Sequence, residues 1–103
     1  MTNHTVRTLD EPLTIPDAQE CLPCYVTRLV ARYGCDGALR WAEVWGHHHE
    51  IPGLPTWLRS RGGYCDCEVL LNVYPHVWLD RREFREPCAG IARPGSTDPC
   101  RRW

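Results

Sequence analysis

The chain has 103 residues, with 12 Lys and Arg together against 13 Asp and Glu, and a formal net charge of -1 at pH 7. This length fits one small domain and excludes two. The near-neutral charge argues against the one-sided basic field that non-specific nucleic-acid binding requires. A domain of this size has a thin core and often needs a metal or disulfide staple, and its seven cysteines can supply one.

Residues 1–19 mix polar residues with two prolines, which predicts an N-terminal arm that is ordered only by docking. No apolar stretch follows a basic start, so we expect no secretory signal. No apolar run approaches the roughly 20 residues of a membrane span. We therefore expect a cytoplasmic protein that does not enter a membrane. In a reducing compartment, an odd number of closely spaced cysteines favours metal or redox chemistry over a disulfide framework.

Two helices are predicted in the first half of the chain. Over residues 21–33 the apolar positions recur at the spacing of one helical face, and Gly34 follows as a stop. Apolar positions over 39–45 predict a second helix that ends near Gly46 and the histidine run 47–49, with Asp36 as its N-cap. Residues 20–86 are thus predicted to form the folded, zinc-binding domain.

The second half of the chain predicts shorter elements. Residues 54–58 predict a short third helix, closed by two glycines. The run 69–74 is too short to separate a strand from a helix, and its β-branched and aromatic content favours a strand. Residues 78–86 predict a last amphipathic helix, and 87–103 a flexible tail. The predicted fold is a compact domain of roughly three to four helices with a small β element.

Two cysteine pairs carry the strongest chemical signal, Cys21-x-x-Cys24 and Cys65-x-Cys67. Zinc holds thiolates at about 2.3 Å, which places two sulfurs roughly 4 Å apart, within reach of side chains in one tight turn. The pairs therefore predict a zinc site. The competing interpretation is that these are metal-free cysteines, which are common small core residues.

Helix geometry limits which cysteines can share one ion. If a helix runs unbroken from Cys24 to Cys35, these residues lie about 16 Å apart, so the five cysteines cannot all bind one zinc. In an up-down-up arrangement Cys65 and Cys67 meet Cys35 and need a fourth ligand. If the chain instead turns back before them, the same pair meets Cys21 and Cys24 in a complete site. Both arrangements stay open, so all five are candidate metal ligands.

Cys88 and Cys100 lie in the predicted tail, apart from the main cluster. They are interpreted as unligated thiols or as an ancillary site with the histidine run 47–49. Adjacent helical residues lie about 100° apart, so three neighbouring imidazoles cannot all face one ion. A solvated helix end, where histidines favour the C-terminal dipole, is the preferred interpretation of that run.

A thiol-redox function is the first alternative. Cys21 and Cys24 form a C-x-P-C motif, in which a helix N-terminus lowers the pKa of the first thiol, as in thioredoxin-like oxidoreductases. The βαβ unit that should precede this motif is missing from the upstream sequence. The chain also lacks a nucleophile elbow, a phosphate-binding glycine loop and an H-E-x-x-H motif, so we expect that the protein is not an enzyme.

Aromatic and arginine side chains indicate candidate partner surfaces. Trp41 and Trp45 lie one helical turn apart and predict an exposed aromatic patch for a protein partner. Arg81, Arg82 and Arg85 lie near aromatic residues, a combination that can contact RNA. Acidic residues interleave with these arginines, which favours ion pairs on a solvated helix face. A small RNA-binding protein is therefore the second alternative.

Three motifs surround the cysteines: CLPCY from residue 21, GCDGALRW from residue 34 and GGYCDCEV from residue 62. They resemble a small bacterial family of domain-of-unknown-function proteins, common in actinobacteria, over about residues 20–74. The resemblance implies a Cys-x-His plus Cys-x-Cys metal site at the positions of Cys35, Cys65 and Cys67. Gly37 stands where the histidine is expected, and Cys24 or Cys21 is the implied replacement.

The sequence therefore predicts a non-enzymatic, zinc-binding adaptor or regulator, in which the zinc is either structural or sensed. In size and CxxC usage the chain is similar to a zinc-responsive class of factors that recruit a hibernation protein to mycobacterial ribosomes. The expected partner is a protein or the ribosome, with nucleic acid only as RNA within such a complex.

Overall fold

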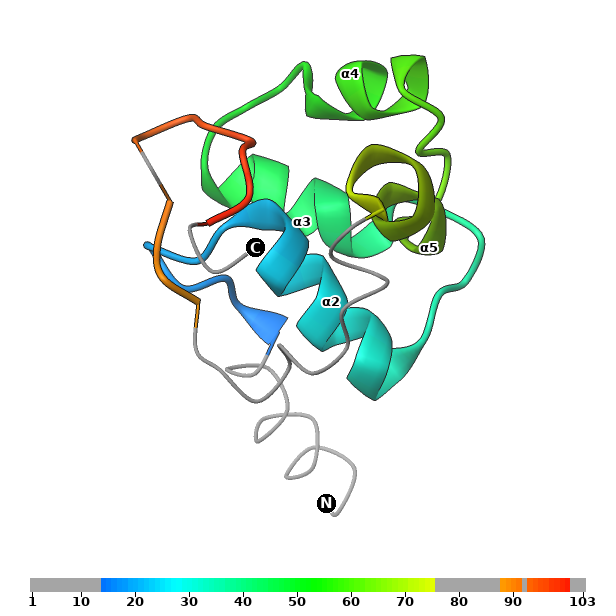
Figure 1. Ribbon diagram of the computed structural model, residues 1–103, viewed down its shortest axis with the longest axis horizontal. Coiled ribbons are helices and arrows are strands. Elements are labelled where there is room, and N and C mark those ends of the chain that lie inside the picture. Colours follow the sequence, from blue (N-terminus) through cyan, green and yellow to red (C-terminus); the bar gives the residue numbers. More distant parts are fainter. Residues whose placement is uncertain (1–13, 76–87, 92, 101–103) are drawn as a thin grey trace, which may run out of the picture.

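The computed structural model describes residues 14–75, 88–91 and 93–100. Within these residues the chain forms helices joined by short loops (Figure 1). The helices are α2 (Leu22–Tyr33), α3 (Arg40–His48), α4 (Leu54–Ser60) and α5 (Asp66–Glu68), and α5 continues as the π-helical turn η1 (Val69–Val73). Helix α2 packs against α3 and η1, and α4 packs on α3. The prediction of a compact, mainly helical fold is confirmed for the described residues.

Helix α2 forms where the apolar periodicity predicts it. Pro23 occupies the first turn, where its missing N–H costs no intrahelical hydrogen bond. Gly34 ends the helix at φ 81°, and its N–H donates to the carbonyl of Val30 at 2.8 Å. Its apolar face is buried, with Tyr25 and Leu29 almost fully withdrawn from solvent. The helix thus packs with its buried face toward α3, α5 and η1.

Helix α3 ends within the histidine run, as the sequence predicts. Gly46 lies inside the helix, which runs to His48. A Cβ atom on Gly46 would lie 2.8 Å from Cδ2 of Leu54, the first residue of α4. This glycine therefore serves close packing between α3 and α4, and it does not end the helix.

The predicted small β element is not formed in the described residues. Val69–Val73 instead continues from α5 as a π-helical turn, and the N–H of Tyr74 donates to the carbonyl of Val69 at 3.0 Å. An isolated strand would leave its backbone groups without partners, whereas a helical turn satisfies them locally. The side chains of Val69 and Leu70 are buried. A short apolar run can be buried as a strand or as a helix, so its composition did not decide between the two conformations.

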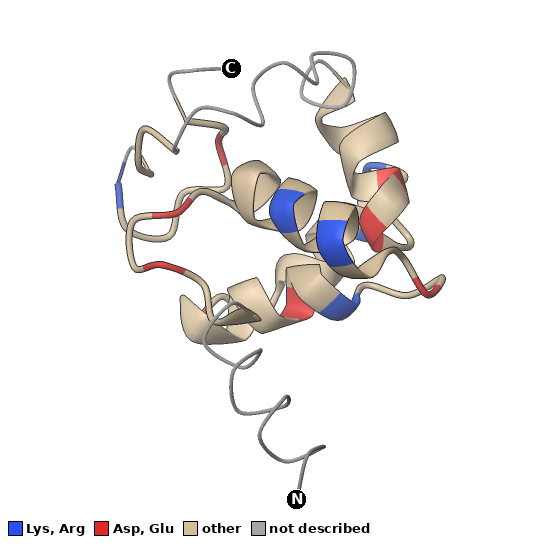
Figure 2. Cartoon of the chain, turned by 90° about the horizontal axis from the view of Figure 1, so that it is seen from below, with Lys and Arg blue, Asp and Glu red and all other residues tan. Residues whose placement is uncertain are grey.

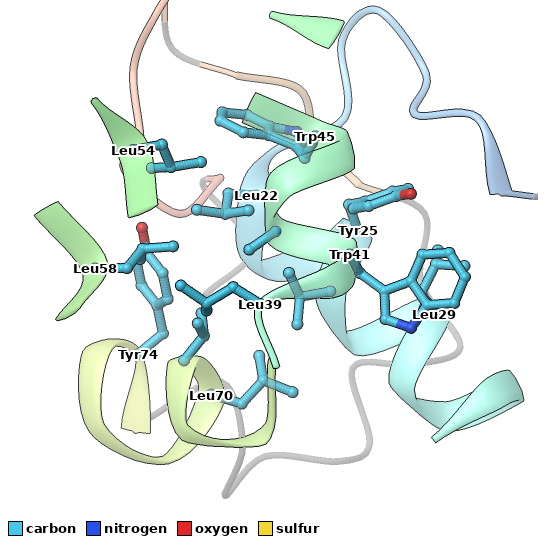
Figure 3. Packing of buried hydrophobic residues seen from close by; sticks show 13 residues of the cluster. Leu22, Tyr25, Leu29, Leu39, Trp41, Trp45, Leu54, Leu58, Leu70 and Tyr74 are labelled. Atoms are coloured by element: carbon cyan, nitrogen blue, oxygen red, sulfur yellow. The ribbon is translucent and has the colours of Figure 1, made fainter. Parts of the chain in front are cut away.

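The core lies between α2, α3 and η1, with leucine side chains from α4 closing it (Figure 3). Trp41 and Trp45 are 4% and 1% exposed, so both indoles belong to this core. The Nε1–H of Trp45 donates to the carbonyl of Glu20 at 2.9 Å. The two tryptophans therefore do not form the exposed patch that the sequence indicated, because thin cores of small domains use large aromatic side chains as filling.

The segment predicted as a flexible tail packs on the core where the structure describes it. The N–H of Ile91 donates to the carbonyl of Gln19 at 2.8 Å, and the hydroxyl of Tyr74 donates to the carbonyl of Thr97. Figure 1 shows residues 88–91 and 93–100 running beside the N-terminal end of α2. The helix predicted over 78–86, with its three arginines, lies outside the described residues. No helix in the described part of the chain is long and apolar enough to cross a membrane.

Candidate metal centre

Four cysteines converge beside the N-terminus of α2. The Sγ atoms of Cys21, Cys24, Cys88 and Cys100 all lie within 4.8 Å of one another. The sulfurs of Cys24 and Cys100 are 3.7 Å apart. Tetrahedral zinc, with Zn–S bonds of about 2.3 Å, requires sulfurs roughly 4 Å apart. The donor set and its spacing therefore fit a four-thiolate zinc ion.

The start of α2 positions the first two of these sulfurs. Cys21 is the N-cap residue, in an extended conformation with φ -76° and ψ 160°, and Cys24 follows in the first helical turn. The positive end of a helix dipole favours thiolates over thiols at this place. A CxxC pair in this setting directs both side chains toward one point.

Backbone hydrogen bonds hold the third sulfur. The N–H groups of Cys21 and Gly90 each donate to Sγ of Cys88, both at 3.3 Å. The adjacent bond from Ile91 to Gln19 fixes the chain that carries Cys88. Amide donors of this kind orient metal-bound sulfur and stabilise its negative charge.

The four thiols are withdrawn from solvent. Cys21, Cys24 and Cys100 are 0%, 6% and 4% exposed, and Cys88 is partly buried. A hydrogen bond with the Cys24 thiol lowers the pKa of Cys21 to about 6, against the opposing effect of burial. Burial raises the pKa of Cys88 to about 11. Four such groups cannot all ionise in one buried place without a cation to balance them.

Two of the other three cysteines make contact at the opposite end of α2. The backbone N–H of Cys67 donates to Sγ of Cys35 at 3.4 Å. This is the contact that the up-down-up arrangement predicted. Among the described residues, only the first four cysteines have ligand atoms close enough to one another to share a metal ion. The alternative arrangement, in which Cys65 and Cys67 join Cys21 and Cys24, does not occur in the structure.

Ionisation of these three cysteines favours one sulfur. Burial raises the pKa of Cys35, but amide bonds from Cys67 and Gly37 and the two neighbouring thiols outweigh it, so the net pKa is lowered. Burial raises the pKa of Cys65, and it raises that of Cys67 to about 11. Cys35 is therefore the first thiolate of the three.

Asp66 is a structural residue that the sequence analysis missed. Its side chain is fully buried, and its carboxylate accepts hydrogen bonds from the N–H groups of Trp41 at 2.9 Å and Ala42 at 3.0 Å. It caps α3 from a distant part of the chain, whereas Asp36, the predicted cap, accepts from Ala38 at 3.2 Å. An acidic residue between two cysteines, followed by an apolar run, was the available signal.

The histidine run agrees with its preferred interpretation as a solvated helix end, whereas the two tail cysteines differ from expectation. His47 and His48 are the last residues of α3, and His49 stacks on Trp45 with ring centroids 4.3 Å apart. None of them belongs to the four-cysteine group. Cys88 and Cys100, which the sequence set apart, complete that group because residues 88–100 fold back on α2.

The fold and this cluster define a small helical protein in which four of the seven cysteines have their sulfurs within 4.8 Å of one another. The chain belongs to the family described as "Protein of unknown function (DUF2695)", whose model matches residues 22–72. It is similar to the uncharacterized proteins Rv2271 of Mycobacterium tuberculosis and Mb2294 of Mycobacterium bovis. Each is 41% identical over 68 residues, which cover 63% of this chain and 69% of the relative. No solved structure matches the chain.

The match confirms the resemblance to a bacterial family of unknown function. The matched residues include Cys24, Cys35, Cys65 and Cys67, and they leave out Cys21, Cys88 and Cys100. The four-cysteine group thus draws three of its sulfurs from outside the segment that the family model covers.

Proposed function

We propose that this protein is a non-enzymatic adaptor whose fold is closed by zinc at Cys21, Cys24, Cys88 and Cys100. The observation that carries the proposal is the convergence of four sulfurs within 4.8 Å of one another. Four thiolates in a tetrahedron are the donor set of structural zinc, and soft sulfur ligands exclude magnesium and calcium. Zinc bound here ties the segment around residues 88–100 to the start of α2.

The closed donor set favours a structural role for the ion. A catalytic zinc keeps one coordination position for water or substrate, whereas four protein thiolates fill all positions. Because an unfolded chain does not present these sulfurs together, the free energy of zinc binding adds to the free energy of folding. Zinc supply therefore controls whether residues 88–100 are docked.

This coupling supports an adaptor or regulator that responds to zinc in the cytoplasm. In the cartoon of Figure 2, positions with Lys or Arg and positions with Asp or Glu are both spread along the described helices and loops. Such a mixed charge distribution favours a protein or ribonucleoprotein partner over bare nucleic acid. Recruitment of a hibernation factor to the ribosome is the specific form of this proposal.

Native mass spectrometry of the untagged, reduced protein tests the zinc site. The variant Cys88→Ser/Cys100→Ser should lose one zinc ion relative to the wild type. Retention of the full zinc content by this variant would contradict the proposed ligand set. The partner proposal is tested by co-purification from cells grown with and without zinc, and it fails if the set of bound proteins does not change.

The thiol-redox alternative needs an accessible nucleophile. Cys21 and Cys24 are 0% and 6% exposed, which leaves no path for a protein disulfide to reach them in the folded state. Thiol titration with and without a chelator separates the two functions. Zinc-held thiols stay unreactive until the metal is removed, whereas a redox pair reacts in both conditions.

A further inference from the structure

We propose that a cleft at the C-terminal end of α3 binds an arginine side chain presented by a protein partner. The cleft has a volume of about 340 Å³, and no cysteine lines it. This inference rests on the proposed adaptor function, since it assigns the surface that holds the partner and the chemical character of the group that is held.

The walls of the cleft combine apolar surface with carboxylates. The apolar part consists of Ile51 and the rings of Pro52 and Pro55, and the acidic part consists of Glu43 and Glu50. Pockets that hold small ligands have volumes of roughly 300–1,000 Å³, so this cleft lies at the small end of that range. Its size therefore suits one side chain better than a helix or a large cofactor.

The turn that ends α3 places Glu50 at the cleft in a strained conformation. The N–H of Glu50 donates to the carbonyl of His47 at 3.1 Å, and the N–H of Ile51 donates to that of Gly46 at 2.8 Å. In this Schellman arrangement the residue at the position of Glu50 is left-handed and is usually glycine. Glu50, at φ 58°, is the one non-glycine residue with a positive φ among those that the structure describes. Strained backbone of this kind clusters at ligand sites, and here it supplies a carboxylate that glycine would not.

The charge around the cleft is negative and is not neutralised within the described part of the chain. Glu43 and Glu50 are exposed, and neither forms an ion pair there, whereas Glu20 pairs with Arg28. The cleft also lies at the C-terminal end of α3, where the helix dipole adds partial negative charge. The ligand that these walls attract is therefore a cation.

The geometry favours an organic cation over a metal ion. Glu43, His47 and Glu50 are not among the described side chains whose ligand atoms lie close enough to share an ion. A guanidinium is planar and weakly hydrated, and its N–H groups point in several directions, so it can donate to separated carboxylates. A lysine ammonium is a compact and strongly hydrated charge, which fits a cleft with apolar walls less well.

A protein is the source of arginine that the apolar walls favour. Ile51 and Pro55 are only partly buried, so this part of the cleft is open to solvent. An arginine in a peptide carries an alkyl stem that covers such a surface, whereas a free guanidinium ion has no stem. Arginine is also enriched at protein interfaces.

An NMR titration of the nitrogen-15-labelled, zinc-loaded, full-length protein with the peptide acetyl-Gly-Arg-Gly-amide tests the proposal. At low salt we expect saturable shifts of the amide signals of residues 43–51, with a Kd on the order of 1 mM that rises with ionic strength. The citrulline peptide keeps the shape of the side chain and loses its charge, so it should bind about tenfold more weakly or not at all. Equal binding of the two peptides would overturn the proposal.

The variant Glu43→Gln/Glu50→Gln removes both charges and keeps the size of both side chains. It should bind the arginine peptide about fivefold more weakly or worse. Asp36→Asn is the matched control, because it removes an exposed carboxylate that does not line the cleft, and it should bind as the wild type does. Unchanged affinity of the double variant would refute the assignment. If that variant does not fold, the comparison of the arginine and citrulline peptides on the wild type decides.

The remaining outcomes separate the cleft from the proposed adaptor function. Binding of free guanidinium ion as tightly as the arginine peptide would overturn a protein source. A dimer in sedimentation that Glu43→Gln/Glu50→Gln dissociates would assign the cleft to a second copy of this chain and overturn a separate partner. If no peptide binds while zinc-dependent partners still co-purify, the cleft is refuted and the adaptor function stands. If the peptide binds as expected and no partner responds to zinc, the adaptor function is refuted and the arginine site stands.

Discussion

Replacing Asp66 with Ala should destabilise the zinc-loaded protein by about 2–4 kcal/mol. The carboxylate is fully buried and accepts two backbone hydrogen bonds, at 2.9 and 3.0 Å. A hydrogen bond to a charged group contributes about 1.5–3 kcal/mol, and an unpaired buried N–H costs about 1–3 kcal/mol. Relief of the buried charge offsets part of this loss, because burial raises the pKa of Asp66 against the effect of the two amides.

Urea and thermal unfolding, followed by circular dichroism at fixed free zinc, measure the effect. For a domain of this size, a loss of 2–4 kcal/mol lowers the midpoint by about 10–25 °C. Asp36→Ala is the matched control, since its exposed carboxylate accepts one N–H at 3.2 Å, and it should cost less than about 1 kcal/mol. Equal stabilities of the two variants would refute the assignment of Asp66 as the residue that joins the C-x-C pair to α3.

Three further predictions follow from the packing and charge of the described core. Gly46→Ala should cost about 1–3 kcal/mol in urea unfolding, because its Cβ would lie 2.8 Å from Leu54; a neutral result would contradict the close packing of α3 on α4. Burial raises the pKa of Tyr25 to about 12, so the folded protein keeps a proton that the unfolded chain releases near pH 10. Stability should therefore fall as the pH rises from 10 to 12, and Tyr25→Phe should reduce that slope in alkaline unfolding. Arg28→Lys should lower the free energy of unfolding by less than about 1 kcal/mol, and by less still at high salt, because the Arg28–Glu20 pair lies partly in solvent. The guanidinium makes two hydrogen bonds to Glu20, at 2.9 and 3.0 Å. A larger loss of stability that does not depend on salt would contradict this partly exposed placement.

The helices were predictable where apolar periodicity decides the structure. The spacing over 21–33 and the glycine after it are sufficient to define α2, because a single face must be buried whatever lies against it. The end of α3 near the histidine run was predictable, whereas the close packing of Leu54 on Gly46 was not, because the sequence alone does not show which residue packs against a helical glycine. The prediction of a strand over residues 69–73 was wrong. A short buried run shows no periodicity, so its conformation depends on the elements packed against it.

The candidate site was predictable in part. The contact of Cys35 with Cys67 followed from helix length and short loops, which are local properties of the chain. The sulfur contact of Cys24 with Cys100 joins residues 76 positions apart. Cys100 has no second cysteine close to it in sequence, so it forms no CxxC or CxC motif. A segment rich in glycine and proline docks here through hydrogen bonds and sulfur contacts, which leave no apolar pattern in the sequence.

The most direct test of the central claim is zinc X-ray absorption on a variant with only the four proposed ligands of the structural site. In Cys35→Ser/Cys65→Ser/Cys67→Ser the remaining thiols are Cys21, Cys24, Cys88 and Cys100, which converge within 4.8 Å. The account predicts one zinc ion with four sulfur neighbours at about 2.3 Å. A variant that folds without zinc, or that binds it through fewer than four sulfurs, would contradict the account.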